Sequence, residues 1–153
     1  MCSAHASFAM FLVAHDLSEA SRRALAQARK LQLSLGAEVS VVHVLAPDLS
    51  DEGSVEKTAG STGRTRYRST VRRHLERSIH GVFGSEVKDV PQTITEGPAV
   101  EQILAAQRER DADLIVVGAS RKVGVTRLLL GSVARGLLRA SRVPVLSMPA
   151  QGE

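Results

Sequence analysis

The chain has 153 residues and a formal net charge of +4, the size of one ordinary domain with a modest excess of basic residues. Hydrophobic residues make up 43%, but three Phe, one Tyr and no Trp disfavour the aromatic stacking by which proteins bind single-stranded nucleic acids. The single cysteine, Cys2, excludes an internal disulfide bond.

The first predicted element is a buried strand. Residues 8–14 (FAMFLVA) form a continuous apolar run of strand length, which is typical of a strand covered on both faces. The run is too short to span a membrane and lacks a basic leader, so we expect a soluble, cytoplasmic protein. Residues 1–7 are expected to be a flexible N-terminus.

A helix and a second strand follow. The helix is predicted to start at Asp16 or Ser18, either of which can cap it, and to end at about Leu35, with Gly36 in the left-handed position. Its apolar stripe consists of Ala24, Leu25, Ala28, Leu31 and Leu35. The apolar run over residues 39–45 predicts the second buried strand.

The next stretch changes from polar to amphipathic. Residues 48–65 are rich in Gly, Ser and Thr without apolar periodicity, which predicts a flexible loop. A second helix is expected over residues 66–82, with Tyr67, Val71, Leu75, Ile79 and Val82 at helical spacing. The basic cluster from Arg64 to Arg77 is interpreted as a solvated face. The alternative is a surface that binds RNA or another polyanion.

The remaining elements complete an alternating pattern. They are a strand within 87–95 that Pro91 places near the sheet edge, a Gly97-Pro98 turn, a helix to about Arg110, a strand over 114–117, a helix over 132–140 and a strand over 143–148. This order predicts an α/β fold, an open five-stranded and mainly parallel sheet with helices on both faces. Residues 8–149 are expected to form a single domain.

The stretch from Asp113 to Pro149 predicts a phosphate ligand. A loop and a helix N-terminus follow a strand there, and both free N–H groups and the helix dipole favour an anion. Five residues separate Gly118 from Gly124 and no lysine follows, which excludes a P-loop. No G-x-G-x-x-G follows the first strand, so dinucleotide redox chemistry has no support either.

Four short motifs, in their order and placement, resemble the universal stress protein family over residues 8–149. They are Ala14-x-Asp16-x-Ser18, His43-Val44, Gly97-Pro98, and a loop in which Gly118 and Arg121 are followed after nine residues by Gly131-Ser132. The loop has the spacing of the family's ATP-binding branch, whose second glycine is replaced here by Arg121.

The resemblance implies a Rossmann-like fold of the adenine nucleotide alpha hydrolase type and an ATP-binding sensor or regulator of the stress response. It implies ATP as ligand, with or without Mg²⁺. Asp16 would contact the adenosine, Ala14 and Val44 would line the adenine pocket beside Val117, and the phosphates would lie on Gly118, Gly131, Ser132 and the Val133 backbone. Asp16 and Ser132 are equally interpretable as helix caps.

Arg121 leaves two alternatives open. An arginine in place of a glycine blocks the phosphates sterically, or its guanidinium pairs with their oxygens. In the first case the chain is a nucleotide-free family member that acts as a protein-interaction module. In the second case Arg121 belongs to the nucleotide-binding residues.

No catalytic residue and no metal site are predicted. No serine or cysteine has a visible base partner, so the resemblance allows at most slow ATP hydrolysis or autophosphorylation. His15 and His43 are interpreted as ordinary residues at the sheet edge. Arg127, Arg135 and Arg139 are interpreted as a solvated face, and the alternative is that they steer anions.

The last predicted strand carries an expectation about assembly. The apolar run from Val143 to Met148 is an edge-strand candidate, and an uncovered apolar edge favours pairing with a second chain. The family resemblance points the same way, to a homodimer in which these strands meet.

Overall fold

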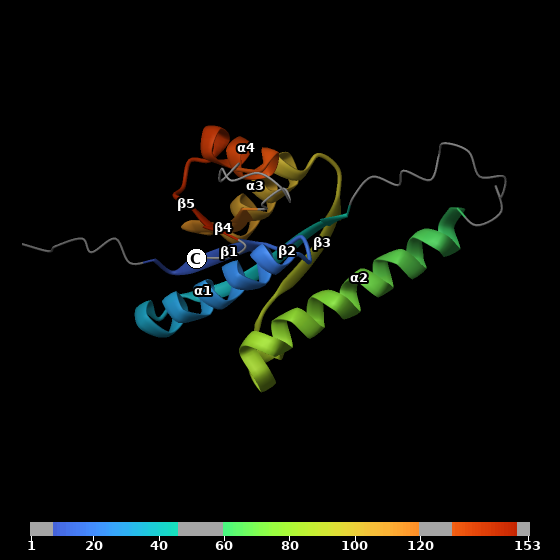
Figure 1. Cartoon of the computed structure of the whole chain (residues 1–153), viewed down its shortest axis with the longest axis horizontal. Coiled ribbons are helices and arrows are strands. Elements are labelled where there is room, and N and C mark those ends of the chain that lie inside the picture. Colours follow the sequence, from blue (N-terminus) through green and yellow to red (C-terminus); the bar gives the residue numbers. More distant parts are fainter. Residues whose placement is uncertain (1–7, 46–59, 120–129, 150–153) are drawn as a thin grey trace, which may run out of the picture.

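Helices alternate with parallel strands in the computed structural model, which describes residues 8–45, 60–119 and 130–149 (Figure 1). In chain order the elements are β1 (Met10–Ala14), α1 (Glu19–Leu35), β2 (Glu38–Leu45), α2 (Gly60–Phe83), the 3-10 helix η2 (Gly84–Asp89), β3 (Gln92–Glu96), α3 (Ala99–Arg110), β4 (Leu114–Ala119), α4 (Ser132–Ala140) and β5 (Val145–Pro149). The five strands are ordered β3-β2-β1-β4-β5, and all neighbours are parallel. The predicted α/β fold class is confirmed.

The strand order reverses between β1 and β4. The strands β2 and β3 lie on one side of β1, and β4 pairs with residues Phe11 to Ala14 on the other side. In open α/β sheets such a reversal leaves a crevice beyond the carboxyl ends of the two strands, because the chain leaves them toward opposite faces. The fold therefore provides a crevice beyond Ala14 and Ala119.

The core has two layers, one on each face of the sheet. Phe11 and Val13 of β1 pack with residues of α1 and α2, whereas Leu12 and Ala14 pack with residues of α3 and α4. Figure 1 shows these two helix pairs on opposite sides of the sheet. Burial on both faces explains why β1 and β4 are continuous apolar runs. None of the described helices is long and apolar enough to cross a membrane.

Two apolar positions expected in the core lie at the surface instead. Leu35 is 52% exposed, because it is the last residue of α1, where Gly36 (φ 71°) turns the chain away. Tyr67 is 49% exposed, because the N-terminal half of α2 projects past the sheet (Figure 1). Val71, Leu75 and Ile79 are buried as predicted.

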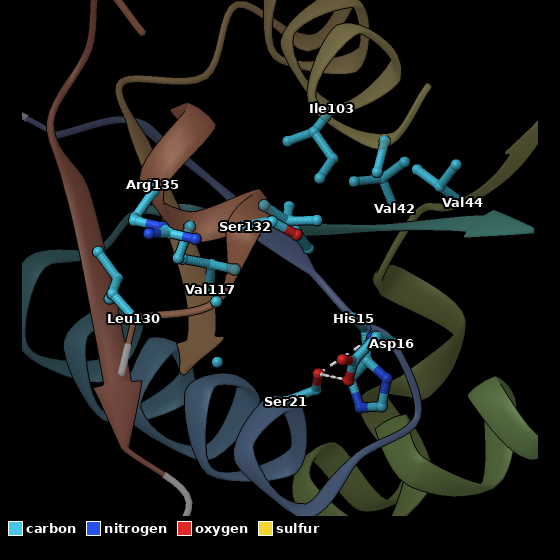
Figure 2. A pocket seen from close by; sticks show the side chains of 16 residues that line it. His15, Asp16, Ser21, Val42, Val44, Ile103, Val117, Leu130, Ser132 and Arg135 are labelled. Carbon is cyan, nitrogen blue, oxygen red and sulfur yellow. Dashed lines mark hydrogen bonds between the residues drawn. The ribbon is translucent and has the colours of Figure 1, made fainter. Parts of the chain in front are cut away.

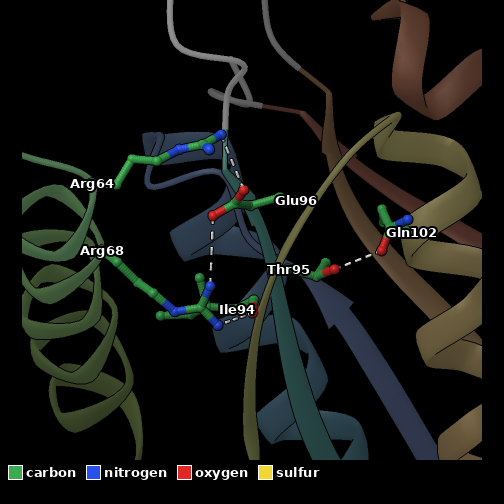
Figure 3. A network of polar contacts seen from close by, with 6 residues as sticks. All are labelled: Arg64, Arg68, Ile94, Thr95, Glu96 and Gln102. Atoms are coloured by element: carbon green, nitrogen blue, oxygen red, sulfur yellow. Dashed lines mark hydrogen bonds and ion pairs between the residues drawn. The ribbon is translucent and has the colours of Figure 1, made fainter. Parts of the chain in front are cut away.

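The helix α2 begins at Gly60, so the predicted loop is wrong for residues 60–65. Glu96 at the end of β3 pairs with Arg64 at 3.3 Å and with Arg68 at 3.7 Å (Figure 3). Arg68 also donates to the Ile94 carbonyl at 2.7 Å. These side-chain contacts tie a polar helical stretch to the end of β3, although the helix backbone itself projects past the sheet (Figure 1). A search for apolar periodicity cannot detect such contacts. The rest of the predicted loop, like residues 1–7, lies outside the described residues.

Prolines set the starts of both edge strands. The third strand, predicted within 87–95, runs from Gln92 to Glu96. It does not start earlier because residues Gly84–Asp89 form η2 and Pro91 lacks the N–H group that a ladder needs. The fifth strand begins at Val145, two residues later than predicted, directly after Pro144. Both strands lie at edges of the sheet, as predicted.

Candidate functional site

A cavity of about 540 Å³ lies in the crevice that the strand order creates (Figure 2). Its walls come from the carboxyl ends of β1, β2 and β4 and from the first turns of α1, α3 and α4. The lining residues are Ala14, His15, Asp16, Ser21, Val42, Val44, Ala99, Ile103, Val117, Gly118, Leu130, Gly131, Ser132, Val133, Ala134 and Arg135.

One wall of the cavity is apolar. Val42 and Val44 of β2 and Ile103 of α3 gather on one side of it (Figure 2). This wall is continuous with the core layer formed by α3 and α4, because Val42 and Ile103 are also buried members of that layer. Such a wall suits a flat apolar group, whereas the polar residues of the cavity lie elsewhere.

Asp16 enters the cavity from the turn that connects β1 to α1. Its Oδ1 accepts hydrogen bonds from the Ser18 backbone N–H (2.9 Å) and from the Ser21 hydroxyl. Partial burial favours a raised pKa for this carboxyl, but the bonds from Ser18 and Ser21 and the neighbouring His15 outweigh it and lower the pKa. Asp16 is therefore ionised at neutral pH and fixed by the start of α1.

Ser18 caps the helix α1. Asp16, the other predicted cap residue, is therefore not the cap. The Ser18 side chain accepts from the Ser21 N–H at 3.2 Å, with the extended backbone of an N-cap residue. Asp16 instead supports the turn beside the cap, in which Leu17 has φ 68°.

His15 and His43 are buried neighbours of this turn, at 2% and 6% exposure. The His43 Nδ1 donates to the His15 carbonyl at 2.6 Å, and the Leu17 N–H donates to the His15 Nδ1 at 3.0 Å. Burial lowers the pKa of His15 to about 4, against the attraction of Asp16 and with repulsion from His43 and Arg22. The sequence places both residues at this edge but does not reveal their burial. Within the described ranges, no group of three or more His, Cys, Asp or Glu is placed to hold a metal ion.

Gly118 is required by packing rather than by a left-handed backbone. Its φ is not positive, but a Cβ atom would lie 2.6 Å from the Ala20 carbonyl carbon and from the Ser21 nitrogen. The glycine therefore lets the first turn of α1 rest directly on β4. That contact positions Ser21, and with it Asp16, at the cavity.

The N-terminus of α4 opens into the cavity. Gly131 is its N-cap residue and makes no side-chain capping bond, so the alternative in which Ser132 caps the helix is wrong. The first intrahelical bond runs from the Arg135 N–H to the Gly131 carbonyl (3.0 Å), which leaves the preceding N–H groups without an intrahelical acceptor. Gly131, Ser132 and Val133 line the cavity, and a Cβ atom on Gly131 would meet nothing within 4 Å, so this helix start faces the cavity.

Eight of the nine residues assigned through the family resemblance line this one cavity. They are Ala14, Asp16, Val44, Val117, Gly118, Gly131, Ser132 and Val133. The ninth, Arg121, lies outside the described residues.

Other lining residues were missed in the sequence. Ala99 and Ile103 come from α3, where only the strand order reveals that a helix from the middle of the chain borders the cavity. The sequence favours a solvated face for Arg135 over the steering of anions, although Arg135 follows Gly131 by one helical turn and so shares its side of α4. That spacing is the signal that could have identified it.

Comparison with known proteins connects this architecture to one family. Residues 8–149 match the model of the universal stress protein family. A universal stress protein of Thermus aquaticus is 28% identical over 143 residues, which cover 91% of this chain and 97% of that protein. Shorter matches to universal stress proteins of Methanocaldococcus jannaschii (41% over 51 residues) and Mycolicibacterium smegmatis (43% over 54 residues) cover 33% and 35% of this chain. The chain spans only 30% and 42% of the lengths of those two relatives in these matches.

Solved structures share the fold over nearly the whole chain. A universal stress family protein from Burkholderia pseudomallei superposes with a TM-score of 0.65 at 27% identity, covering 94% of this chain and 97% of that one. A universal stress protein in complex with cAMP superposes with a TM-score of 0.63 at 22% identity, covering 95% and 99%.

Proposed function

Because the chain belongs to the universal stress protein family, we propose that its cavity binds an adenine nucleotide, with ATP as the ligand. In this proposal the protein is a cytoplasmic sensor or regulator of the stress response whose state depends on bound nucleotide. The observation that carries the proposal is the combination, in one cavity, of an apolar wall and an open helix N-terminus. The complex of a related fold with cAMP supports an adenine ligand.

The cavity suggests how the ligand lies. Val42, Val44 and Ile103 offer an apolar surface for the adenine ring, while the Asp16 carboxylate can accept hydrogen bonds from ribose hydroxyls. Phosphates are favoured at the start of α4, where free N–H groups and the helix dipole meet the ligand. Asp16 can also bind Mg²⁺ carried by the phosphates, since Mg²⁺ is held by one or two carboxylates together with phosphate oxygens.

The proposal includes no catalytic residue. Asp16 is the acidic side chain among the described residues that line the cavity. Its lowered pKa and its hydrogen bonds from Ser18 and Ser21 make it a weak general base. Binding, rather than turnover, is therefore the activity that this cavity favours.

A direct test is calorimetric titration of ATP into the wild-type protein and an Arg121→Gly variant. We expect saturable binding by the wild type with a dissociation constant below about 1 mM. Weaker binding by the variant would show that Arg121 holds the phosphates, and tighter binding that it obstructs them. No binding by either protein at millimolar ATP would favour the alternative, a nucleotide-free interaction module.

A homodimer through β5 is part of the proposal. This edge strand carries half-buried Val145, Leu146 and Met148, and pairing with a second copy would cover them. We expect sedimentation velocity at micromolar concentration to give the mass of a dimer. A stable monomer under those conditions would contradict this part of the proposal.

The basic face of α2 has less support as a polyanion-binding surface. Arg64 and Arg68 already pair with Glu96, although both side chains are partly exposed (Figure 3). Arg72, Arg73 and Arg77 remain exposed on the helix. The cavity, by contrast, combines shape, apolar surface and anion-binding groups in one place.

A further inference from the structure

The cavity carries opposite charges on opposite sides. Among its described lining residues, Asp16 and Arg135 are the side chains that are charged at neutral pH, since the lowered pKa of His15 keeps that ring neutral. Figure 2 shows Asp16 beside Ser21 at one side and Arg135 at the other, near Leu130. A ligand with an anionic end is therefore repelled by the Asp16 side and attracted by the Arg135 side.

Arg135 lies where the anion-binding groups of α4 converge. Its backbone N–H makes the first bond of the helix, and its side chain lines the same cavity as Gly131, Ser132 and Val133. The N–H groups of the turn that precedes this bond have no intrahelical acceptor. Its side chain is exposed, and within residues 8–45, 60–119 and 130–149 no carboxylate pairs with it. As far as the described residues go, the guanidinium is therefore available to a ligand without the loss of an ion pair.

We propose that Arg135 binds the phosphates and makes the cavity selective for adenine nucleotides with a polyphosphate chain over adenosine and cyclic monophosphates. A guanidinium can bind two phosphate oxygens at once, and a polyphosphate offers more charge and more oxygens than a single phosphodiester. The inference rests on the proposed nucleotide function and deepens it by naming the residue that selects the polyphosphate chain.

The test compares Arg135→Gln with Arg139→Gln. Arg139 is exposed in the last turn of the same helix and does not line the cavity, so its substitution removes the same charge at a different place. We expect Arg135→Gln to weaken ATP binding roughly ten-fold while adenosine binding changes less than about two-fold. Arg139→Gln should leave both affinities near the wild-type values. The ATP effect should shrink at high salt, because the arginine is exposed.

The outcomes separate the inference from the function on which it rests. Wild-type ATP binding that Arg135→Gln leaves unchanged would overturn the role of Arg135 and leave the proposed function standing. An equal loss for ATP and adenosine, or an equal effect of Arg139→Gln, would overturn it as well. A wild-type protein that binds neither ligand would overturn the proposed function and the inference together. Unfolding midpoints of both variants, expected at the wild-type value, verify that each is folded.

Discussion

Replacing Gly118 by alanine is expected to lower the free energy of unfolding by roughly 2–3 kcal/mol, the upper range for overpacking a well-packed site. The added Cβ atom would lie 2.6 Å from two backbone atoms of α1, the Ala20 carbonyl carbon and the Ser21 nitrogen. Backbone cannot rotate away as a side-chain tip can, so the whole first turn of α1 has to move. For a chain of this size such a loss lowers the unfolding midpoint by about 5–10 °C.

Gly131→Ala is the matched control for this prediction. Gly131 has φ −59°, which alanine adopts freely, and a Cβ atom there would meet nothing within 4 Å. Alanine is a poorer N-cap residue than glycine, so we expect the unfolding midpoint to fall by about 2–3 °C, clearly less than for Gly118→Ala. Thermal and urea unfolding of both variants measure the difference. Equal stability of Gly118→Ala and Gly131→Ala would show that α1 does not rest on β4 as described.

Acidification is expected to destabilise the protein through His15, by about 2 kcal/mol between pH 7.5 and pH 5. Burial lowers the pKa of this histidine from 6.5 to about 4 in the folded state. Below pH 6.5 the unfolded chain therefore binds a proton that the folded protein excludes. The stability is fully present above the unfolded pKa and is lost as the pH falls from about 6.5 toward 4. The lowered pKa of Asp16 contributes stability that is constant above the ordinary value of 3.8 and is lost only at lower pH, outside this window.

Urea unfolding of the wild type, His15→Gln and His80→Gln at several pH values measures this effect. His80 is exposed on α2, so its substitution should preserve the loss of stability on acidification. His15→Gln should be less stable at pH 7.5 but should depend less on pH between 7.5 and 5. The same pH dependence in all three proteins would contradict a buried, neutral His15.

The two classes of element that sequence patterns predicted well are buried strands and capped helices. Of the apolar runs over 8–14 and 114–117, residues 11–14 and 114–117 are buried, whereas Phe8 and Ala9 precede β1 and are exposed. Ser18 and Gly36 form the two ends of α1 as expected. These features depend on neighbouring residues, which is why a local pattern specifies them. The family motifs likewise lie at strand ends and helix starts, so the strand order brings them together in one cavity.

The features that the sequence did not reveal depend on contacts between distant segments. The early start of α2 accompanies ion pairs of Arg64 and Arg68 with Glu96, about thirty residues away. The burial of His15 depends on packing around the end of β1, and the need for Gly118 depends on how closely α1 approaches. Arg135 is exposed like any surface arginine, and only its position at the cavity distinguishes it from the others.

The most direct test of nucleotide binding in this cavity is an NMR titration of the ¹⁵N-labelled protein with ATP. We predict saturable shifts of backbone amides around the cavity, concentrated at Asp16, Val44, Val117, Gly131 and Ser132, with α2 unaffected. Shifts confined to the exposed arginines Arg72, Arg73 and Arg77 would indicate a polyanion surface instead. The absence of shifts at millimolar ATP, or shifts on α2 alone, would contradict the account.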